Sequence, residues 1–321
     1  MTVELGWSYR GFEVVFLENA ELKVSVVPQI GAKIHQFIDK SIDRDLLFHH
    51  PRVGFRQPVF GANVDNWWTG GVDDVVPTGH PCTVNGEDLP YLGELWSVPW
   101  ELEVLDESSV RLTARGTITP LRLRRTMTLR PGERHVSVHY ELTNEGMVRF
   151  PYLWGVHPAV PIGPATQVHV PAREAWYSEG DVPFDEPRLA PGQTAAAPWP
   201  ITSLARLERA PRRTWTHLYL SDLMDGWVGV SDLDEGWGFG IRFDLGQFSD
   251  IHLWLVDGGW RGVRCVAVEP WTGRPSRLDQ ALDQGRARWL EAGESVEANV
   301  ALVAFTPRVG SGPDDPGRSH E

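Results

Sequence analysis

The sequence predicts an all-β protein, built as a large antiparallel β-sandwich with few short helices. Apolar and polar residues alternate with a period of two in many short segments, which puts one face of each strand on a core. The chain contains 32 Gly and 25 Pro residues, which separate these segments. Long segments of helical period are hard to find. Many short strands with turn residues between them are typical of antiparallel sandwiches and barrels.

The alternating segments follow one another along the chain. The clearest are residues 22–26, 110–114, 121–124, 136–142, 227–230, 238–243 and 296–305. Residues 129–133, with the sequence LRPGE, join two of them and predict a hairpin turn, because Pro and Gly supply turn geometry. Short helices are expected only at residues 275–285 and 203–209.

A single domain is expected over residues 1–307, because no clear linker interrupts the strand pattern. Residues 308–321 carry no apolar pattern and predict a disordered tail. Residues 183–200 are rich in Pro and Ala and predict an irregular surface excursion within the domain. The sequence contains no nucleotide-binding glycine motif and no repeat of the propeller or solenoid kind.

Composition and charge exclude several classes of protein. The 321 residues are 41% hydrophobic and 23% charged, which is typical of a folded, soluble protein and excludes collagen, coiled coil and overall disorder. With 43 acidic and 30 basic residues, the formal net charge is −13. This balance disfavours nucleic acid and anionic membrane as partners, because both carry phosphate. No apolar stretch is long enough to predict a membrane-spanning helix.

Cysteine usage and the N-terminus bear on location. The first residues, MTVELG, lack the charged and then apolar profile of a secretory signal. Cys82 and Cys265 lie far apart and form no CxxC motif, so we expect buried free thiols rather than a metal or redox site. A reducing cytoplasm fits this usage, and we predict a cytoplasmic protein.

Three segments concentrate residue types that an alternating strand does not need. The first is residues 66–80, NWWTGGVDDVVPTGH, which contains Trp68, Asp73, Asp74 and His80. Two adjacent Trp, two Gly, two Asp and a His are an unusual set for a loop that only connects strands. The structural alternative is that the aromatic pair closes one end of the sandwich while the Asp residues form turns.

The other two segments each contain one candidate acid–base residue. Residues 150–158 place His157 beside aromatic residues and a Pro at a strand end, where an imidazole can be held rigidly; a purely structural His is the alternative. Residues 265–273 place Glu269 after a continuous apolar run. A carboxylate there is unfavourable unless it is hydrogen-bonded or used, and burial would raise its pKa and make it a better base. A Glu that caps the following turn is the alternative.

Several Trp residues lie in the same three segments as these titratable groups. Trp faces stack against the apolar C–H face of a sugar ring, whereas Asp, His, Arg and Glu bind hydroxyl groups. The residues alone therefore indicate a carbohydrate site. They do not indicate a reaction.

From about residue 22 to residue 305, the chain resembles the galactose mutarotase-like superfamily, and within it the aldose 1-epimerase-related proteins. The order and spacing of several segments carry the resemblance together. These are residues 19–34 (opening strands with a Gly turn), 43–47 ("grelL"), 70–78 ("GGWDExFPT"), 93–102 ("HGELWxxPW") and 269–273 ("EPxTG").

The resemblance implies a large antiparallel β-sandwich with a sugar cleft, a small-molecule carbohydrate ligand, and no metal or cofactor. In mutarotases a Glu removes the proton of the anomeric hydroxyl while a His protonates the ring oxygen. The ring opens, the C1–C2 bond rotates, and reclosure gives the other anomer. Position by position, Glu269 matches the base and His157 matches the acid.

The chain departs from the family's pattern at Leu92, which stands where the family has a sugar-contacting His before the "GELW" element. His80 is considered as its substitute, and Arg56 as the counterpart of the family's cleft Arg. The predicted substrate-binding residues are His80, Asp74, Asp73, Arg56, Trp154, Trp68 and Trp271.

Two alternatives to the isomerase remain open. A non-catalytic carbohydrate-binding protein on the same fold is favoured by the departure at Leu92. Lyase or glycoside chemistry on this fold would give Tyr91 or Tyr152 an acid–base role. The candidate segments lack the multiple Arg and Lys that a phosphosugar would need, which favours a neutral sugar.

Overall fold

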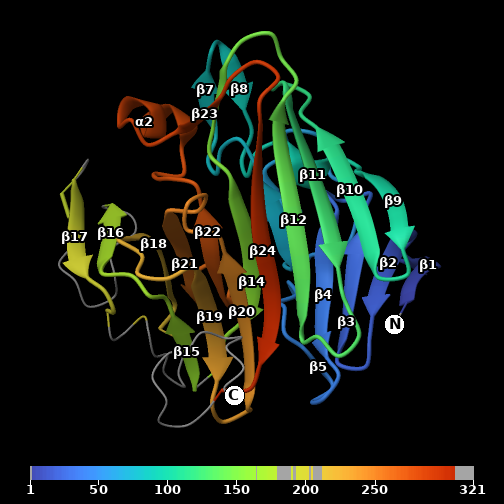
Figure 1. Cartoon of the computed structure of the whole chain (residues 1–321). Coiled ribbons are helices and arrows are strands. Elements are labelled where there is room, and N and C mark those ends of the chain that lie inside the picture. Colours follow the sequence, from blue (N-terminus) through green and yellow to red (C-terminus); the bar gives the residue numbers. More distant parts are fainter. Residues whose placement is uncertain are drawn as a thin grey trace.

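Two large β-sheets lie face to face and contain most strands of the protein (Figure 1). The computed structural model describes residues 2–163, 165–178, 189–190, 193–201, 204 and 212–307. The strands that pair within both large sheets run antiparallel. The predicted all-β antiparallel sandwich is therefore confirmed.

The larger sheet has 12 strands and combines both halves of the sequence. Its spatial order is β1 (Thr2–Tyr9), β2 (Phe12–Glu18), β3 (Leu22–Val27), β4 (Lys33–Asp39), β6 (Val72–Val75), β14 (Gly155–Pro161), β22 (Arg264–Trp271), β21 (Asp250–Asp257), β18 (Thr214–Ser221), β16 (Glu174–Ser178) and β17 (Thr194–Pro198), with β5 (Arg44–Asp45) beside β4. The central strands β6, β14 and β22 thus bring the three segments singled out in the sequence next to one another.

The smaller sheet has 8 strands. Its order is β15 (Thr166–His169), β19 (Trp227–Asp232), β20 (Trp237–Phe243), β24 (Ser295–Phe305), β12 (His135–Asn144), β11 (Leu121–Thr128), β10 (Ser109–Arg115) and β9 (Glu101–Asp106). All of the segments predicted from period-two alternation between residues 110 and 142 lie in this sheet.

Short elements sit beyond one end of the two sheets, at the top of Figure 1. They include the hairpin of β7 (Cys82–Val84) with β8 (Glu87–Leu89), the pair of β13 (Phe150–Tyr152) with β23 (Arg288–Leu290), and the helix α2 (Leu278–Asp283). Single turns of 3-10 helix occur at Val64–Asn66 and Leu95–Ser97. The helix α2 confirms the short helix expected within residues 275–285.

Several expectations fall on or near residues that the structure does not describe. The helix predicted at residues 203–209 and the tail predicted at 308–321 lie outside the described residues, Leu204 apart. The irregular excursion predicted over residues 183–200 is wrong for Thr194–Pro198, which form β17 by pairing with β16. The rest of that segment is only partly described. The single domain over residues 1–307 stays a prediction.

Alternation along the central strands creates two apolar cores. Val156 and Val160 of β14, with Val266 and Val268 of β22, belong to the main core between the two sheets. The alternate residues, such as Ala159, face the opposite side, where a second core gathers aromatic side chains from several loops. That core includes Phe48, Trp68, Trp96, Leu92, Cys265 and Trp271. The larger sheet is therefore covered on both faces at its centre.

Two successive glycines allow the loop before β6 to approach the sheet closely. Gly70 and Gly71 both have positive φ values, +84° and +85°. A Cβ atom on Gly70 would clash with the carbonyl of Phe48, and one on Gly71 would lie 2.5 Å from the carbonyl oxygen of Ile34. Only glycine tolerates both the conformation and the approach, which explains the Gly pair in the sequence.

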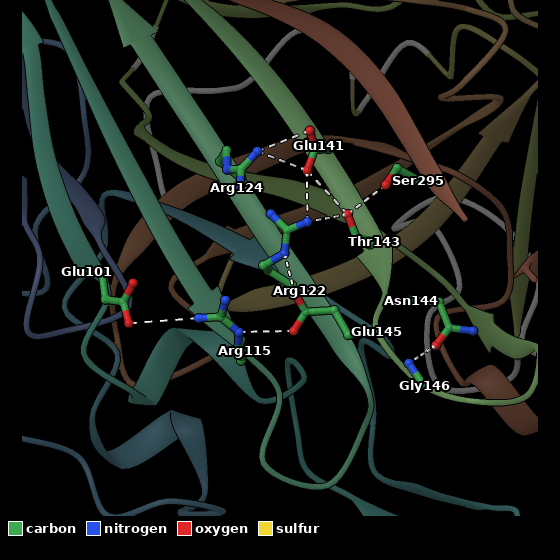
Figure 2. A network of polar contacts seen from close by, with 10 residues as sticks. All are labelled: Glu101, Arg115, Arg122, Arg124, Glu141, Thr143, Asn144, Glu145, Gly146 and Ser295. Atoms are coloured by element: carbon green, nitrogen blue, oxygen red, sulfur yellow. Dashed lines mark hydrogen bonds and ion pairs between the residues drawn. The ribbon is translucent and has the colours of Figure 1, made fainter. Parts of the chain in front are cut away.

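The outer face of the smaller sheet carries an ion-pair network (Figure 2). Arg124 of β11 donates to both carboxylate oxygens of Glu141 of β12, at 3.1 and 3.2 Å. Arg122 pairs with Glu141 and Glu145, and Arg115 also reaches Glu145. These opposite charges lie on adjacent strands and account for part of the polar half of the period-two pattern.

Two further expectations concern the cysteines and the membrane. Cys82 and Cys265 are both buried and unpaired, as expected, and burial raises the pKa of the Cys265 thiol. Among the described residues, the structure contains no helix long and apolar enough to cross a membrane.

Candidate functional site

A cavity of about 260 Å³ lies on the outer face of the larger sheet, over strands β14, β22, β21 and β18. Loops from three parts of the chain form its walls. The lining residues are Val64, Asp65, Trp68, Gly79, His80, Tyr91, Leu92, His157, Trp215, His217, His252, Trp254, Trp260, Glu269, Trp271 and Ser276. Five of the predicted site residues are therefore brought together: Glu269, His157, His80, Trp68 and Trp271.

The register of the sheet sets polar side chains in one row beneath the cavity. His157 of β14 lies opposite Asp73 of β6. The pairs on either side, Gly155 with Trp271 and Ala159 with Ala267, place His157 opposite Glu269 of β22 as well. Glu269 pairs with His252 of β21. Residues directly opposite each other in antiparallel strands share a face, so the acid–base pair is a product of register.

Glu269 is held at the floor of the cavity by two neighbours. Its Oε2 accepts a hydrogen bond of 2.9 Å from Nε1 of Trp271, and its Oε1 lies 3.5 Å from Nε2 of His157. The side chain is only 4% exposed. Burial raises the pKa of Glu269, while the charge of His157 and the Trp271 hydrogen bond act in the opposite direction. A carboxylate with a raised pKa is a stronger base at neutral pH.

Trp271 can reach Glu269 because the neighbouring strand has no side chain at this level. A Cβ atom on Gly155 would lie 2.3 Å from the Trp271 ring. The indole packs instead on the bare backbone of β14, and His252 stacks on it with ring centroids 4.3 Å apart and an interplanar angle of 11°. The glycine after Trp154 therefore helps to position the hydrogen-bond donor of the carboxylate.

His157 is oriented by aromatic side chains. Its ring packs edge-on against Trp68, with centroids 6.0 Å apart, and tilted against Trp254 at 6.3 Å. Its Nε2 faces Glu269, whereas its buried Nδ1 has no hydrogen-bond partner within the described part of the chain. The imidazole is thus free to exchange a proton through Nε2 without breaking another contact.

Three further imidazoles line the cavity. Burial lowers the pKa of His217 to about 3, with the charges of His80 and His157 acting in the same direction. Burial also lowers the pKa of His80 and, strongly, that of His252. Neutral imidazoles offer both a donor and an acceptor, which suits hydroxyl groups.

The tautomer of His252 follows from one contact. Its Nε2 lies 3.0 Å from the carbonyl oxygen of Gly273, which can only accept, so Nε2 carries the hydrogen. The buried Nδ1 is then an acceptor, and it has no partner among the described residues. His252 therefore presents an unused acceptor at a cavity-lining position beside Glu269.

A polar chain joins three walls of the cavity. Nδ1 of His80 lies 3.3 Å from Oγ of Ser276, which lies 3.2 Å from the hydroxyl of Tyr219. The backbone N–H of Leu92 donates to the carbonyl of Gly79 at 2.7 Å, so Leu92 and His80 are neighbours in the same wall. His80 thus reaches the cavity from beside the position where Leu92 departs from the family's pattern.

Two neighbouring acidic residues of β6 do not line the cavity, which corrects their predicted role. The Asp73 carboxylate is buried and accepts a hydrogen bond of 2.6 Å from Nζ of Lys33, which also donates to the Gly70 carbonyl. Asp74 points into the space between the two sheets, where Arg125 and Tyr140 bind it. Alternation along β6 explains the difference in direction, and each carboxylate is buried and paired with a cation outside the cavity.

Arg56 and Trp154 also lie elsewhere than predicted. Arg56 donates to the backbone carbonyl of Asn66 and stacks over Trp67, outside the cavity. Trp154 is fully buried and packs against Tyr140 and Phe248 in the main core. Trp154 comes immediately before β14, and it alternates in step with Val156 and Val160, so its side chain faces the main core. Of the alternative acid–base tyrosines, Tyr91 lines the cavity and the buried Tyr152 does not.

The cavity residues that β18 and β21 contribute were not predicted from the sequence. His252 and Trp254 occupy alternate positions of β21, and Trp215 and His217 occupy alternate positions of β18. The segments TWTHLYLS and DIHLWLVD do carry a signal, since aromatic and His residues alternate there with small or aliphatic ones. A strand with this pattern places its ring-bearing residues on one face.

Solved structures of similar fold come from several bacteria. A candidate aldose 1-epimerase from Klebsiella pneumoniae matches with a TM-score of 0.73 and 15% identity, over 94% of this chain and 82% of that one. A galactose mutarotase-like protein from Clostridium acetobutylicum gives 0.69 and 11%, over 95% and 98%. One from Lactobacillus casei gives 0.64 and 15%, over 91% and 100%. The similarity shows the fold: the chain shares its large β-sandwich with these proteins.

The sequence also matches the model of one protein family. The sequence model of DUF4432, a domain of unknown function, matches residues 9–303, and the chain belongs to this family.

Proposed function

We propose that this protein is a carbohydrate isomerase of the aldose 1-epimerase type, with Glu269 as base and His157 as acid. The observation that carries the proposal is the Glu269–His157 pair at the floor of the cavity, with Oε1 and Nε2 3.5 Å apart. The resemblance of the sequence to aldose 1-epimerase-related proteins at these same two positions supports it.

The spacing of the pair suits the reaction. The anomeric hydroxyl and the ring oxygen are bonded to the same carbon, so the groups that serve them must lie close together. Ionised Glu269 takes the proton of the anomeric hydroxyl, and the imidazolium of His157 gives its proton to the ring oxygen as the C1–O5 bond breaks. The raised pKa of Glu269 supports its role as base.

The second half of the reaction reverses the first. After bond breaking, C1 is a carbonyl carbon and the ion pair has become a neutral acid and a neutral imidazole. Rotation about C1–C2 turns the other face of the carbonyl toward the O5 hydroxyl. As O5 attacks, it returns its proton to His157, and Glu269 returns its proton to the new anomeric hydroxyl. Both residues end as they began.

The rest of the lining supports a neutral sugar as substrate. Trp68, Trp254 and Trp260 offer aromatic faces that can stack against the C–H face of a ring. The imidazoles of His80, His217 and His252 offer hydrogen bonds to hydroxyl groups. All of the lining residues are described, and none is Lys or Arg, so the cavity provides no ammonium or guanidinium group for a phosphate.

Polarimetry tests the proposal directly. Wild-type protein is expected to speed the change in optical rotation of at least one freshly dissolved neutral aldose. The E269Q variant retains the shape of the side chain but is not basic, and we expect its rate to fall by at least about 100-fold. The matched control is E141Q, which alters a carboxylate on the outer face of the smaller sheet. Full activity in E269Q would remove Glu269 from the mechanism.

A second candidate function is a sugar-binding protein without catalysis. It is favoured by Leu92, a buried apolar side chain in the cavity wall where the family's pattern has a His. Calorimetric binding of aldoses, without rate enhancement by the wild-type protein across a broad panel, would select this function over the isomerase.

A further inference from the structure

Trp215 differs from every other residue that lines the cavity. Its side chain is 41% exposed, while the other lining residues are buried or half-buried. In the described part of the chain its ring contacts no other aromatic ring, whereas Trp68, Trp254 and Trp260 pack against one another. The cavity thus opens to solvent beside an indole face that the protein leaves unused.

The sheet register measures how far Trp215 lies from the reacting groups. Glu269 of β22 is level with His252 of β21, which is level with Tyr219 of β18. Trp215 is therefore two strands across from Glu269 and four residues along β18. With strands about 4.8 Å apart and about 3.3 Å per residue, the two α-carbons are separated by roughly 16 Å.

This separation exceeds what one sugar ring spans. A monosaccharide whose anomeric carbon contacts Glu269 fills the buried end of the cavity, between Trp68, Trp254 and the imidazoles. We therefore expect a monosaccharide placed there to leave the Trp215 ring uncovered. An exposed Trp face at the mouth of a carbohydrate site is suited to stacking against the C–H face of a second ring.

We propose that the cavity takes a reducing disaccharide, or the reducing end of a longer glycan, with the second ring stacked on Trp215. The orientation rests on the proposed function, which places the anomeric carbon at Glu269. In a pyranose, C1 and C4 lie at opposite ends of the ring. With C1 at the buried end, C4 points to the mouth, so the preferred linkage is 1→4.

The same geometry disfavours a 1→2 linkage. In a 1→2 disaccharide the second ring is attached beside the anomeric carbon. That ring would have to lie where His252, Trp271 and the backbone of β14 already close the cavity. The proposal therefore distinguishes 1→4 from 1→2 disaccharides of the same two sugars.

Calorimetry on the E269Q variant tests the inference without turnover, with wild-type protein measured in parallel. We expect cellobiose, maltose or lactose to bind at least about tenfold more tightly than the corresponding monosaccharide. Adding the substitution W215A should weaken disaccharide binding by about tenfold and change monosaccharide affinity by no more than about twofold. The 1→2 disaccharides sophorose and kojibiose should bind no more tightly than glucose.

A matched control uses another exposed Trp. Trp289 is 44% exposed on β23 and does not line the cavity, so W289A should change neither affinity. Equal losses for monosaccharide and disaccharide in W215A would overturn the inference. So would wild-type and E269Q proteins that bind 1→4 disaccharides no better than monosaccharides. Disaccharide affinity that depends on Trp215, in a protein without mutarotation activity, would support the subsite and overturn only the proposed catalysis.

Discussion

Two buried carboxylates near the centre of the larger sheet behave in opposite ways. Asp74 of β6 and Glu269 of β22 are separated only by β14, and burial raises the pKa of both. Asp74 faces the space between the sheets, where Nη1 of Arg125 binds it at 2.6 Å and the Tyr140 hydroxyl at 2.8 Å. Glu269 faces the cavity, with one hydrogen bond and one looser ionic neighbour.

The difference separates a structural carboxylate from a reactive one. Both oxygens of Asp74 accept from donors of the facing sheet, so the group joins the two sheets and lies away from the cavity. Among the described residues, the contact of Oε1 of Glu269 is with His157, at 3.5 Å, a distance that a substrate hydroxyl can replace with a shorter contact. Raised pKa alone would not distinguish the two residues; partner geometry and access do.

The largest expected effect on stability comes from removing Asp74, the buried partner of Arg125. Asp74→Ala leaves the guanidinium of Arg125 buried, since its side chain is 0% exposed, without a counter-charge. Breaking a buried pair in this way is expected to lower the free energy of unfolding by about 3–5 kcal/mol. Chemical denaturation monitored by Trp fluorescence measures it.

The comparison variant is Glu269→Gln, which is expected to change the free energy of unfolding by no more than about 1 kcal/mol, because the amide keeps the Trp271 hydrogen bond. The double variant Asp74→Leu, Arg125→Met should recover much of the loss, since it leaves no unpaired charge. Equal destabilisation by Asp74→Ala and Glu269→Gln would show that the two carboxylates are not distinct in role.

The burial of His217 at the cavity also predicts that the free energy of unfolding depends on pH, with an effect of intermediate size. The folded-state pKa of His217 is about 3, below the value of about 6.5 in an unfolded chain. Between these values the unfolded state binds more protons, so stability falls as the pH falls. Asp74 and Glu269, with raised pKa values, contribute the opposite slope.

A comparison of variants separates the contribution of the His217 imidazole to the pH slope from that of the Asp74 and Glu269 carboxylates. Between pH 7 and pH 5, His217 is expected to cost the wild-type protein about 2 kcal/mol of stability. The loss in His217→Gln should therefore be smaller by that amount. His139→Gln, on the exposed face of β12, is the control and should follow the wild type. Identical pH slopes in all three proteins would contradict the assigned burial effect.

The sequence was sufficient for the fold and for part of the site. Period-two alternation identified the sandwich, because each strand has one face on a core. Glu269 and His157 could be singled out because each ends or follows an apolar run. Which carboxylate of the Asp73–Asp74 pair faces which side depended on pairing with β4 and β14, and local sequence does not specify it.

The differences between the predicted and the observed cavity residues have a common physical cause. His217, His252 and Trp254 lie on strands outside the three segments, and the order β14, β22, β21, β18 brings these strands side by side. Arg56 was predicted in the cavity as the counterpart of the family's cleft Arg, and Trp154 because it lies in the same segment as His157. Arg56 stacks over Trp67 instead, and Trp154 packs against Tyr140 in the main core. Both contacts form only in the folded chain.

The smallest expected effect compares neighbouring arginines of β11. Arg125 points inward to Asp74, and Arg124 points outward to Glu141, where its side chain is 38% exposed. Arg124→Ala should lower the free energy of unfolding by less than about 1 kcal/mol, because solvent screens the pair and Glu141 retains Arg122. The loss should shrink further in 1 M salt, whereas the loss in Asp74→Ala should not. A cost for Arg124→Ala as large as that for Asp74→Ala would mean that burial and full partnership do not decide the role of a charge in this fold.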